Sequence, residues 1–410
     1  MKDVIRQLAE AMSAASPDAQ FEVRYWDGTG FSIGTEPEFI LHFKNERALS
    51  RVLSDAFMGF GESYMLGDIE VEGDIKKLFY LGFAIDFAER PMSLMLRIKL
   101  AFHFLRARNT IARSRENISF SYDIGNDFYE ILLGKGMIYT CAYFTSPDNT
   151  LDEAQNNKLE LVCRKLCLKP GEHVADLGCG WGGFLMYAAE NYDITGVGFT
   201  ISAEQRDYAI QKIAERGLSD KIEIRLQDAR EADGLYDKVA SIGMVEHMGN
   251  AQIAPVFERI AHILKPQGLA FVHTIGNEIP RPIDPWIDKY IFPGTQASPL
   301  TTMVEAAGNN DLYMIDLENI RLHYPPTVKY WLANFDANID RIREMYDDTF
   351  VRSFRLYLEV ASSSFSWGDN RLYHLLMTRG LKNDVPMTRE HLVLPKSGSS
   401  PAGTSSEGGA

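Results

Sequence analysis

Residues 174–183 read VADLGCGWGG, and this stretch decides the fold. Its apolar start is typical of a buried β-strand, and residues 184–191 after the turn are predicted to form a helix. Four glycines fall within six positions of the turn. Glycines leave the backbone open to a ligand, and the helix that follows begins with free N–H groups. We therefore predict a strand–turn–helix unit with a ligand bound at its turn.

The spacing of these glycines indicates which class of ligand the turn binds. It is not the G-x-G-x-x-G of dinucleotide sites. It reads D-x-G-x-G-x-G from Asp176 onward, a pattern typical of methyltransferases that use S-adenosylmethionine. Gly178, Gly180 and Gly182 would line the loop around the methionine part of the cofactor, and Asp176 would orient that loop. A generic glycine-rich turn between a strand and a helix is the alternative.

The bulk composition indicates a globular protein of two domains. A chain of 410 residues is long for one core. Its 45% hydrophobic and 24% charged residues are ordinary for such proteins. The net charge of −14 argues against nucleic acid as the main partner, because a protein that binds phosphate backbones needs a broad basic surface.

The chain shows no signal for export. Its N-terminus lacks the apolar core of a signal peptide, and no apolar stretch reaches the ~20 residues of a membrane span. We therefore expect a cytoplasmic location with free thiols. Cys163 and Cys167, four positions apart on an apolar helical face, are expected to be packing residues, and no metal site is predicted.

Residues 1–88 are predicted to form a small α+β module. The pattern indicates helices over 4–15, 46–58 and 74–87, and strands over 21–26, 31–33 and 39–43. The module contains no cluster of catalytic residue types, so its sequence alone does not indicate a role.

Residues 89–116 are predicted to be a helical linker with an unusual charge. From 90 to 115 the segment has no acidic residue, in a chain that is acidic overall. A basic helix rich in apolar residues suits an anionic membrane surface, so we expect peripheral attachment to the inner face of the membrane. A partly buried linker helix with a solvated basic edge is the alternative. The basic residues are Arg90, Arg97, Lys99, Arg106, Arg108, Arg113 and Arg115.

Residues 117–392 are predicted to be a catalytic α/β domain, followed by a small polar tail, 393–410, which is expected to be disordered. Strands and helices alternate after residue 151, which predicts a parallel sheet covered on both faces. The last strand follows a long helical insertion and is expected to pair antiparallel at an edge. The predicted fold is a class I S-adenosylmethionine methyltransferase, with a Rossmann-like sheet of seven strands over 173–177, 195–200, 222–226, 238–243, 268–275, 313–320 and 371–378.

The ends of the second and third strands carry further candidates for cofactor binding. The second strand ends without the acid that many nucleotide-binding folds use for the ribose hydroxyls, so Thr200 and Gln205 are the polar candidates there. Gln227, Asp228 and Ala229 follow the third strand, where they are placed to meet the adenine. Asp228 could equally cap a turn.

Two polar residues mark the ends of the fourth and fifth strands. Glu246 comes just past the end of the fourth, and His273 lies at the end of the fifth. Ligands of open α/β sheets bind outside the carboxyl ends of the strands. We therefore expect Glu246 and His273 to lie next to the cofactor, although a histidine in a strand is commonly a hydrogen-bonded core residue.

Seven motifs occur in order along the chain: YDIGNDFY, YTCAYF, the glycine loop, GFTIS-x-x-Q, SIGMVEHMG, HTIG and HYPPTVKYW. Together they resemble the cyclopropane-fatty-acyl-phospholipid synthase family, which includes the mycolic acid cyclopropane synthases and related lipid methyltransferases. The resemblance covers residues 117–380. Residues 1–88 fit the longer bacterial members, which carry an extra lipid-handling domain.

The resemblance implies a bicarbonate ion bound at the reacting centre. It also implies that Tyr139 and Thr140 contact the cofactor. The ligands of the bicarbonate ion would be Cys141, Glu246, His273, the backbone of Ile275, and Tyr324.

The activity implied by the resemblance is transfer of a methylene group from S-adenosylmethionine to the double bond of unsaturated phospholipid acyl chains. A cyclopropane ring forms, with bicarbonate as the general base. One position departs from the family, because Ala361 stands where many members carry a cysteine. A lipid C-methyltransferase that gives methyl- or methylene-branched chains is therefore the alternative. The helical linker would also allow a homodimer with two domains on one bilayer.

Two further classes are disfavoured by the same residues. A cofactor-binding scaffold without activity would be expected to lose some of Glu246, His273 and Tyr324, and all three are present. A methyltransferase for soluble small molecules would not need the basic apolar segment or the extra N-terminal module.

Overall fold

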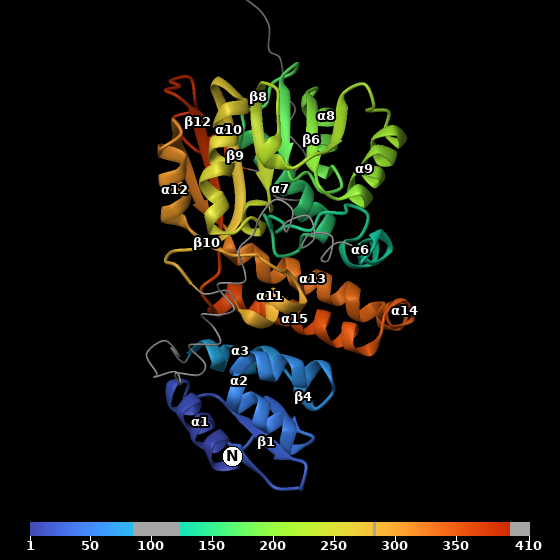
Figure 1. The fold of residues 1–410 in the computed structure, drawn as a ribbon, viewed down its shortest axis with the longest axis vertical. Helices are drawn as coiled ribbons and strands as arrows, with labels where there is room; N and C mark the ends of the chain where they lie inside the picture. Colours follow the sequence, from blue (N-terminus) through green and yellow to red (C-terminus); the bar gives the residue numbers. More distant parts are fainter. Residues whose placement is uncertain (85–123, 282–283, 394–410) are drawn as a thin grey trace, which may run out of the picture.

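The computed structural model describes residues 1–84, 124–281 and 284–393. The linker predicted over 89–116, and all but the first residue of the tail predicted over 393–410, lie outside the described residues. Along its long axis the molecule has three layers: the N-terminal module, a layer of helices, and a large sheet with its covering helices (Figure 1). Within the described residues we find no helix that combines the length and the apolar character of a membrane span.

The N-terminal module is a four-stranded sheet with helices, in the strand order β2-β1-β3-β4. The sequence pattern does not predict β4. The helix predicted over 46–58 continues as α2 to Met65, because buried Phe60 and Tyr64 prolong its apolar face beyond a kink at Ala56. The elements are α1 (Lys2–Ala15), β1 (Phe21–Tyr25), β2 (Gly30–Ile33), β3 (Phe39–Phe43), α2 (Glu46–Met65), β4 (Ile69–Gly73) and α3 (Ile75–Ala84).

The second sheet has eight strands: seven in the order β11-β12-β9-β8-β5-β6-β7, and the short β10, which pairs with β9. This confirms the predicted Rossmann-like sheet beside a smaller α+β module. The strand before the glycine loop, β5, and the two strands after it, β6 and β7, have the predicted bounds, whereas β9 is longer than predicted. The strands are β5 (His173–Leu177), β6 (Thr195–Thr200), β7 (Ile222–Leu226), β8 (Tyr236–Ile242), β9 (Leu264–Asn277), β10 (Ser298–Pro299), β11 (Leu312–Asn319) and β12 (Arg371–Arg379).

The last strand, β12, is not at an edge of the sheet, so that prediction is wrong. β12 lies between β9 and β11 and is antiparallel to both. Its residues from Leu372 to Thr378 are all buried, which only a strand with a neighbour on each side and both faces covered can achieve. β11 forms the edge instead, and its burial alternates, with Tyr313 and Ile315 exposed.

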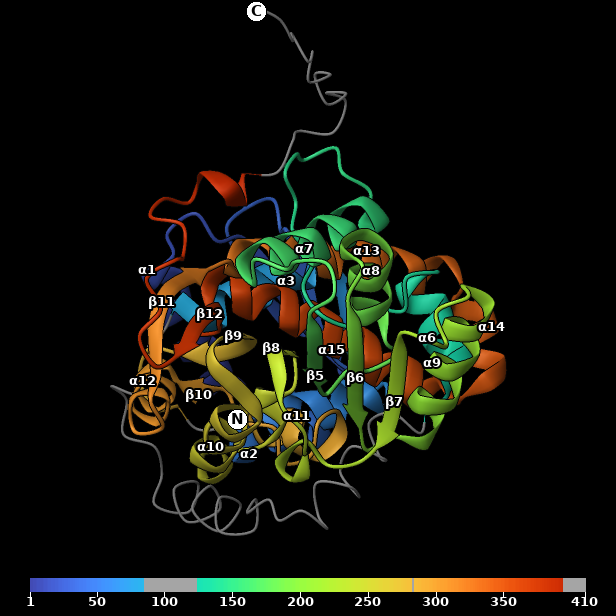
Figure 2. The ribbon, with the colours of Figure 1, turned by 90° about the horizontal axis from the view of Figure 1, so that it is seen from above.

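Helices cover both faces of this sheet, as Figure 2 shows. On one face α7 (Leu151–Lys165), α8 (Gly183–Tyr192) and α9 (Ala203–Glu215) form one apolar core with the strands. On the other face α10 (Ile253–Ile263) and α12 (Leu300–Gly308) form a second core. A capping box of Thr150 and Glu153 fixes the start of α7.

A helical layer separates the large sheet from the N-terminal module (Figure 1). It consists of α6 (Asn126–Leu133), α11 (Pro285–Tyr290), α13 (Tyr324–Ala337), α14 (Ile339–Met345) and α15 (Asp348–Trp367). Short 3-10 helices are η1 (Ala229–Glu231), η2 (Val245–His247), η3 (Asn250–Gln252), η4 (Arg321–His323) and η5 (Glu390–Leu392).

The N-terminal module packs on this layer through a shared apolar core. Trp286, Ile291 and Leu356 are buried among the side chains of the module. The Arg352 side chain donates hydrogen bonds to the carbonyls of Tyr64 (2.5 Å) and Ile69 (3.0 Å). The module is therefore held by both burial and directed polar contacts.

Candidate active site

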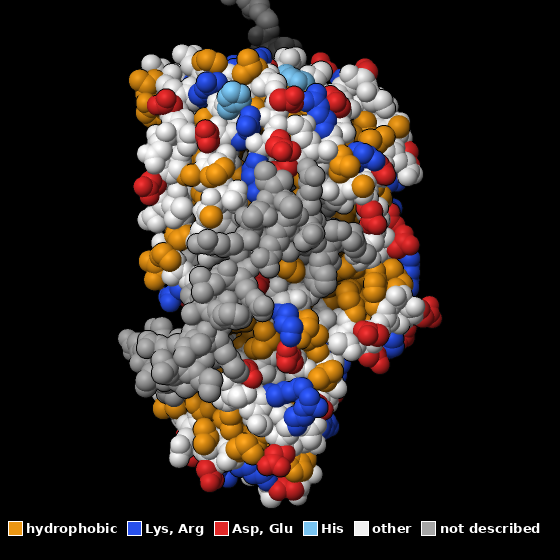
Figure 3. Space-filling model, in the orientation of Figure 1, with side chains coloured by type: hydrophobic (Ala, Val, Ile, Leu, Met, Phe, Trp, Pro, Cys, Tyr) orange, Lys and Arg blue, Asp and Glu red, His pale blue; other side chains and the backbone are white. Residues whose placement is uncertain are grey.

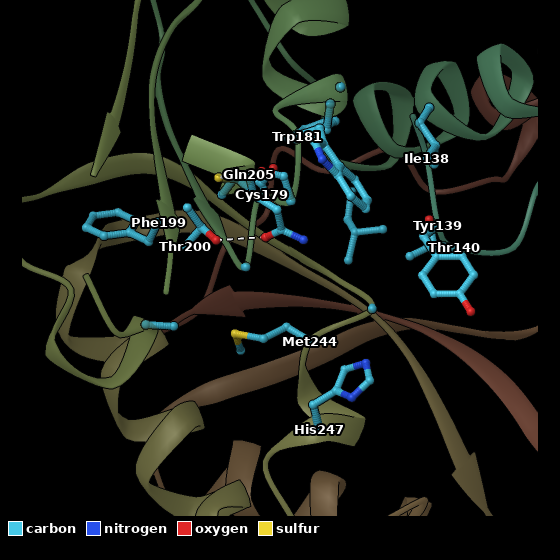
Figure 4. A pocket seen from close by; sticks show the side chains of 18 of the residues that line it. Ile138, Tyr139, Thr140, Cys179, Trp181, Phe199, Thr200, Gln205, Met244 and His247 are labelled. Carbon is cyan, nitrogen blue, oxygen red and sulfur yellow. Dashed lines mark hydrogen bonds between the residues drawn. The ribbon is translucent and has the colours of Figure 1, made fainter. Parts of the chain in front are cut away.

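A pocket opens at the carboxyl ends of β5, β6 and β8, where the strand order reverses on the two sides of β5. This is the position at which open α/β sheets bind their ligands. The pocket encloses about 1010 Å³, open solvent at its mouth included. In Figure 4, Thr200 and Gln205 lie toward one side of the pocket, Tyr139 and Thr140 toward the other, and Met244 and His247 below.

The glycine loop forms one wall of the pocket. A Cβ at Gly178 would lie 2.7 Å from Met244 Cβ, so only glycine fits there without a shift. A Cβ at Gly180 would meet nothing within 4 Å, which places this glycine against open space. Gly182 is not among the lining residues. It is the N-cap of α8, with a φ of 81°, and Gly183 lines the pocket instead.

Asp176 and Lys158 are both buried and both line the pocket. Burial raises the pKa of Asp176 to about 7, and the nearby Lys158 ammonium opposes this rise. Burial also lowers the pKa of Lys158 to about 8. The Lys158 Nζ donates a hydrogen bond to Thr140 Oγ1 at 2.9 Å. Lys158 therefore bonds the segment that carries Thr140, and its charge also acts on Asp176 of the glycine loop.

Gln155, one turn before Lys158 on α7, holds the same segment by its backbone. Its Nε2 donates to the carbonyls of Thr140 (2.9 Å) and Ile138 (3.4 Å). Our sequence reasoning missed Gln155 and Lys158. Their signal was available, since they are polar residues spaced three apart on a helix face that is otherwise apolar.

The far side of the pocket carries the candidates from β6 and β7. The Thr200 hydroxyl donates to Gln205 Oε1 at 2.9 Å. Asp228 lines the pocket and also caps η1, where it forms a 2.7 Å ion pair with Arg230. The structure brings together all the predicted cofactor residues except Gly182; the lining ones are Tyr139, Thr140, Asp176, Gly178, Gly180, Thr200, Gln205, Gln227, Asp228 and Ala229.

Glu246 lies in η2, directly after β8, and is held by β9. The Thr274 hydroxyl donates to Glu246 Oε2 at 2.8 Å, and the Ile275 backbone N–H donates to Oε1 at 3.4 Å. Burial raises the pKa of Glu246 to about 7. Its carboxyl group can therefore hold or release a proton near neutral pH.

The other predicted anion ligands lie on neighbouring elements. His273 is buried in β9, and its Nδ1 lies 2.9 Å from Nε2 of His374. Burial raises the pKa of the Cys141 thiol, which lies 3.8 Å from Thr327 Oγ1 of α13. Tyr324, at the start of α13, stacks on Phe365 with ring centroids 4.0 Å apart.

The predicted anion ligands and the residues that line the cofactor pocket are neighbours along the chain but share no member. None of the five predicted anion ligands lines the cofactor pocket. However, Thr140 and His247 do line it, and they directly precede Cys141 and follow Glu246 in the chain. Cys141 and Tyr324 belong to one aromatic-rich cluster against which Ile275 packs. Two of the predicted anion ligands, Cys141 and Glu246, are therefore direct sequence neighbours of residues that line the cofactor pocket.

The residues of the pocket fit S-adenosylmethionine. Gly180 faces open space, and Asp176 Oδ1 is buried without a hydrogen-bond partner among the described residues. A bound ligand with an ammonium group would supply that partner. Within the same described ranges, no group of three His, Cys, Asp or Glu side chains could hold a metal ion.

The predicted anion site offers both donors and acceptors. The Cys141 thiol and the Tyr324 hydroxyl can donate hydrogen bonds, while the Glu246 carboxyl and a His273 ring nitrogen can accept them. Bicarbonate itself carries both accepting oxygens and one hydroxyl group, so this set of side chains fits it chemically.

This fold and pocket define a class of enzyme, the class I S-adenosylmethionine-dependent methyltransferases. Comparison with known proteins gives the family. The model of the mycolic acid cyclopropane synthetase family matches residues 109–375, and the chain belongs to this family. A domain of unknown function matches residues 8–86. The resemblance inferred from the seven motifs is thus confirmed.

Individual relatives support the same assignment. The chain is 34% identical to the cyclopropane-fatty-acyl-phospholipid synthase of Escherichia coli K12, over 88% of this chain and 93% of that protein. It is 32% identical to a protein of Pseudomonas putida described as a probable fatty acid methyltransferase, over 90% and 95%. The crystal structure of mycolic acid cyclopropane synthase CmaA1 complexed with SAH and CTAB is similar, with a TM-score of 0.61 and 28% identity, over 64% of this chain and 98% of that one.

Proposed function

We propose that this methyltransferase transfers a methylene group from S-adenosylmethionine to the double bond of unsaturated phospholipid acyl chains and closes a cyclopropane ring, with bound bicarbonate as the general base. The observation that carries the proposal is the buried Glu246 beside the cofactor pocket, fixed by Thr274 and Ile275, with a pKa of about 7. A second anion next to Glu246 requires that this carboxyl be protonated or share a proton.

The chemistry needs proximity and a dry, electron-rich environment. S-adenosylmethionine, when bound, supplies the methyl group, and an isolated alkene is a poor nucleophile, so the reactants must be held in line. Methylation of an alkene leaves positive charge on the acyl chain, which ring faces can stabilise. The Tyr139 ring supplies such a face, 5.1 Å from Trp331 and 5.2 Å from Tyr129.

Three further aromatic side chains, those of Tyr324, Tyr143 and Phe144, lie in or against the same cluster. Tyr324 is buried against Phe365, in the same cluster as Cys141. Tyr143 and Phe144 stack on His323 and Tyr330 respectively, 4.4 and 6.1 Å between ring centroids. We therefore propose Tyr139 and Tyr324 as the rings that face the charged acyl chain.

Exposed aromatic side chains support a membrane substrate. Tyr80, Phe83 and Trp367 are each 38–44% exposed, and the rings of Tyr80 and Trp367 lie 5.3 Å apart. Figure 3 shows hydrophobic side chains on the face in view, among them a group at its lower end, over the N-terminal module. Phe83 comes just before the basic segment of the sequence, so aromatic anchors and basic residues adjoin along the chain. We propose peripheral attachment of this end to an anionic membrane.

A lipid C-methyltransferase that yields branched acyl chains is the second candidate. One observation favours it: Ala361, one turn after Tyr357 on α15, places a methyl group where many family members carry a cysteine. The Pseudomonas putida relative, described as a probable fatty acid methyltransferase, is consistent with either product.

Lipid analysis separates the two candidates. We would express the chain in cells supplied with unsaturated fatty acid, detect an added CH2 by mass spectrometry, and record proton NMR spectra of the lipids. Shielded ring protons would support the cyclopropane product. An added CH2 without them would establish the branching activity, and unchanged lipids would contradict both.

Liposome binding tests the membrane substrate. Reversal of Arg106 and Arg108 to Glu should weaken binding to anionic liposomes, since each basic residue near such a surface contributes about 1 kcal/mol. Arg106→Lys with Arg108→Lys keeps the charge and serves as the control. Equal binding of the reversed and control proteins would contradict attachment through this segment.

A further inference from the structure

A row of polar side chains crosses three neighbouring strands behind the predicted anion site. His273 of β9 stands opposite His374 of β12, and His374 stands opposite Glu318 of β11. His273 Nδ1 lies 2.9 Å from His374 Nε2, and His374 Nδ1 lies 3.9 Å from Glu318 Oε2. The row therefore runs from the core of the sheet to its edge strand.

The outer end of the row is fixed by α7. Lys165, which is fully buried, forms ion pairs with Glu318 Oε2 at 3.0 Å and with Asp316 at 2.5 Å. Glu318 is thus held as a carboxylate in contact with a cation on one side and facing His374 on the other. Both histidines of the row are 1% exposed, so neither can exchange its partner for bulk water.

The two imidazoles are neutral. Burial lowers the pKa of His273 and that of His374 well below the usual value, and the charges around them act in the same direction. The charge of Lys158 lowers the pKa of both rings, and Lys165 and His323 also lower that of His374. A neutral imidazole carries one proton and one lone pair, so each ring has one donor and one acceptor nitrogen.

The carboxylate that His374 Nδ1 faces indicates which nitrogen carries the proton. His374 Nδ1 faces a carboxylate oxygen and makes no hydrogen bond within the part of the chain that the structure describes. A lone pair directed at a carboxylate is repelled, whereas an N–H is attracted, so the His374 proton is on Nδ1. Its Nε2 is then an acceptor, and the His273 proton must be on Nδ1 to complete the 2.9 Å bond.

We infer that His374 is a positioning residue that, oriented by Glu318, holds His273 in the tautomer protonated at Nδ1 and leaves His273 Nε2 as a hydrogen-bond acceptor toward the predicted anion site. This inference rests on the proposed function. An acceptor at His273 Nε2 favours a planar oxyanion that carries a hydroxyl proton, such as bicarbonate. It disfavours a planar oxyanion without such a proton, such as nitrate. Outer-shell partners of this kind typically change affinity or activity by about 10–100-fold.

Side-chain nitrogen NMR of the full-length protein tests the tautomer directly. With 15N-labelled histidine, long-range proton–nitrogen correlation distinguishes protonated from bare ring nitrogens, and His273→Gln assigns the His273 signals by their loss. We expect His273 to be protonated at Nδ1 in the wild type. His374→Gln keeps an acceptor oxygen near the same place and should preserve this state. His374→Leu removes the acceptor and should populate the tautomer protonated at Nε2.

Activity provides the second readout. His374→Leu should raise the bicarbonate concentration for half-maximal turnover by about tenfold or more, with unchanged affinity for S-adenosylmethionine, while His374→Gln stays near wild type. If His374→Leu does not fold, Glu318→Gln gives the same test, because it should move the His374 proton from Nδ1 and mix the His273 tautomers.

The outcomes separate this inference from the proposed function. A wild-type protein with His273 protonated at Nε2 would overturn the inference, as would a His374→Leu protein with the wild-type tautomer and bicarbonate dependence. If the wild-type enzyme turns over equally without bicarbonate, the proposed base is wrong. In that case the tautomers in the wild-type, Gln and Leu proteins still decide the role of His374.

Discussion

The buried ammonium of Lys158 donates a hydrogen bond to the Thr140 hydroxyl at 2.9 Å. This bond joins α7 to the segment that lines the cofactor pocket with Thr140 and continues into Cys141. The same Lys158 is the cation that acts on Asp176 of the glycine loop. The Lys158 side chain therefore acts both on the glycine loop of the cofactor pocket and on the segment that leads into Cys141.

Lys158→Met should weaken cofactor binding by about tenfold, equivalent to 1.4 kcal/mol. The substitution deprives Thr140 of its donor and Asp176 of its nearest cation, and it should cost about 1–3 kcal/mol of folding stability. Isothermal titration with S-adenosylmethionine and urea unfolding measure the two effects. Lys169→Met, at an exposed position just after α7, is the control. Wild-type affinity in Lys158→Met would contradict the linking role.

Gly180→Ala should reduce cofactor affinity by at least about tenfold. The new Cβ meets no protein atom within 4 Å, so it enters the space that we assign to the cofactor. Its φ of 54° also costs an alanine about 1–2 kcal/mol. Gly217→Ala is a matched control, because Gly217 has a φ of 69° and equally open surroundings, but it does not line the pocket. Equal affinity in both variants would remove Gly180 from the cofactor site.

Glu246→Gln should lower turnover by about 10² or more and leave cofactor affinity near wild type. The amide keeps the volume of the side chain but cannot exchange a proton with a bound anion. Single-turnover measurements with unsaturated lipid give the rate, and titration gives the affinity. Glu278→Gln, at an exposed position just beyond β9, is the control. A fully active Glu246→Gln enzyme would exclude Glu246 from the chemistry.

Glu246 should also impose a pH dependence on stability. Its pKa rises from 4.5 to about 7 on folding, so between these values the unfolded chain binds fewer protons than the native one. Wild-type stability should therefore fall, relative to Glu246→Gln, as pH rises from about 4.5 to about 7, by about 3 kcal/mol in total. Urea unfolding of both proteins at pH 5 and pH 8 measures this. Asp176 titrates similarly in both proteins, so the difference between their free energies of unfolding reports on Glu246. If this difference is the same at both pH values, the pKa of Glu246 is not raised on folding.

Arg352→Ala should loosen the N-terminal module. The Arg352 side chain bonds two carbonyls of the module, pairs with Glu70 at 3.1 Å and lies over the Tyr64 ring. Loss of these contacts should cost about 1–3 kcal/mol and accelerate limited proteolysis between the module and the catalytic domain. Arg341→Ala, at an exposed position of α14, is the control. Equal cleavage rates would show that apolar burial alone holds the module.

Much of the fold was predictable because its signals are local. The bounds of β5 and β6 follow from short buried runs, and those of β7 from apolar residues that alternate with charged ones. The interior position of β12 was not predictable from local signals, because strand order depends on pairing with β9 and β11 across the long insertion of α13–α15. The extension of α2 past Ala56 depends on apolar partners in other elements.

The candidate site shows the same division. The glycine loop and the polar residues at strand ends could be predicted, because a parallel sheet brings the ends of its strands together. Gly182, which the glycine spacing also assigned to the cofactor loop, is the N-cap of α8. His374 was not predictable, because its role depends on cross-strand register, whereas the polar spacing of Gln155 and Lys158 on α7 was visible in the sequence.

Leu356 of α15 and Trp286 of α11 are both buried in the core of the N-terminal module. The surface of the catalytic domain that meets the module is therefore apolar. A shortened chain that begins at residue 124 would present these large apolar side chains to solvent. Such a fragment should self-associate and precipitate at concentrations at which the whole chain stays dispersed. The solubility of the catalytic domain is, in this sense, supplied by the first 84 residues.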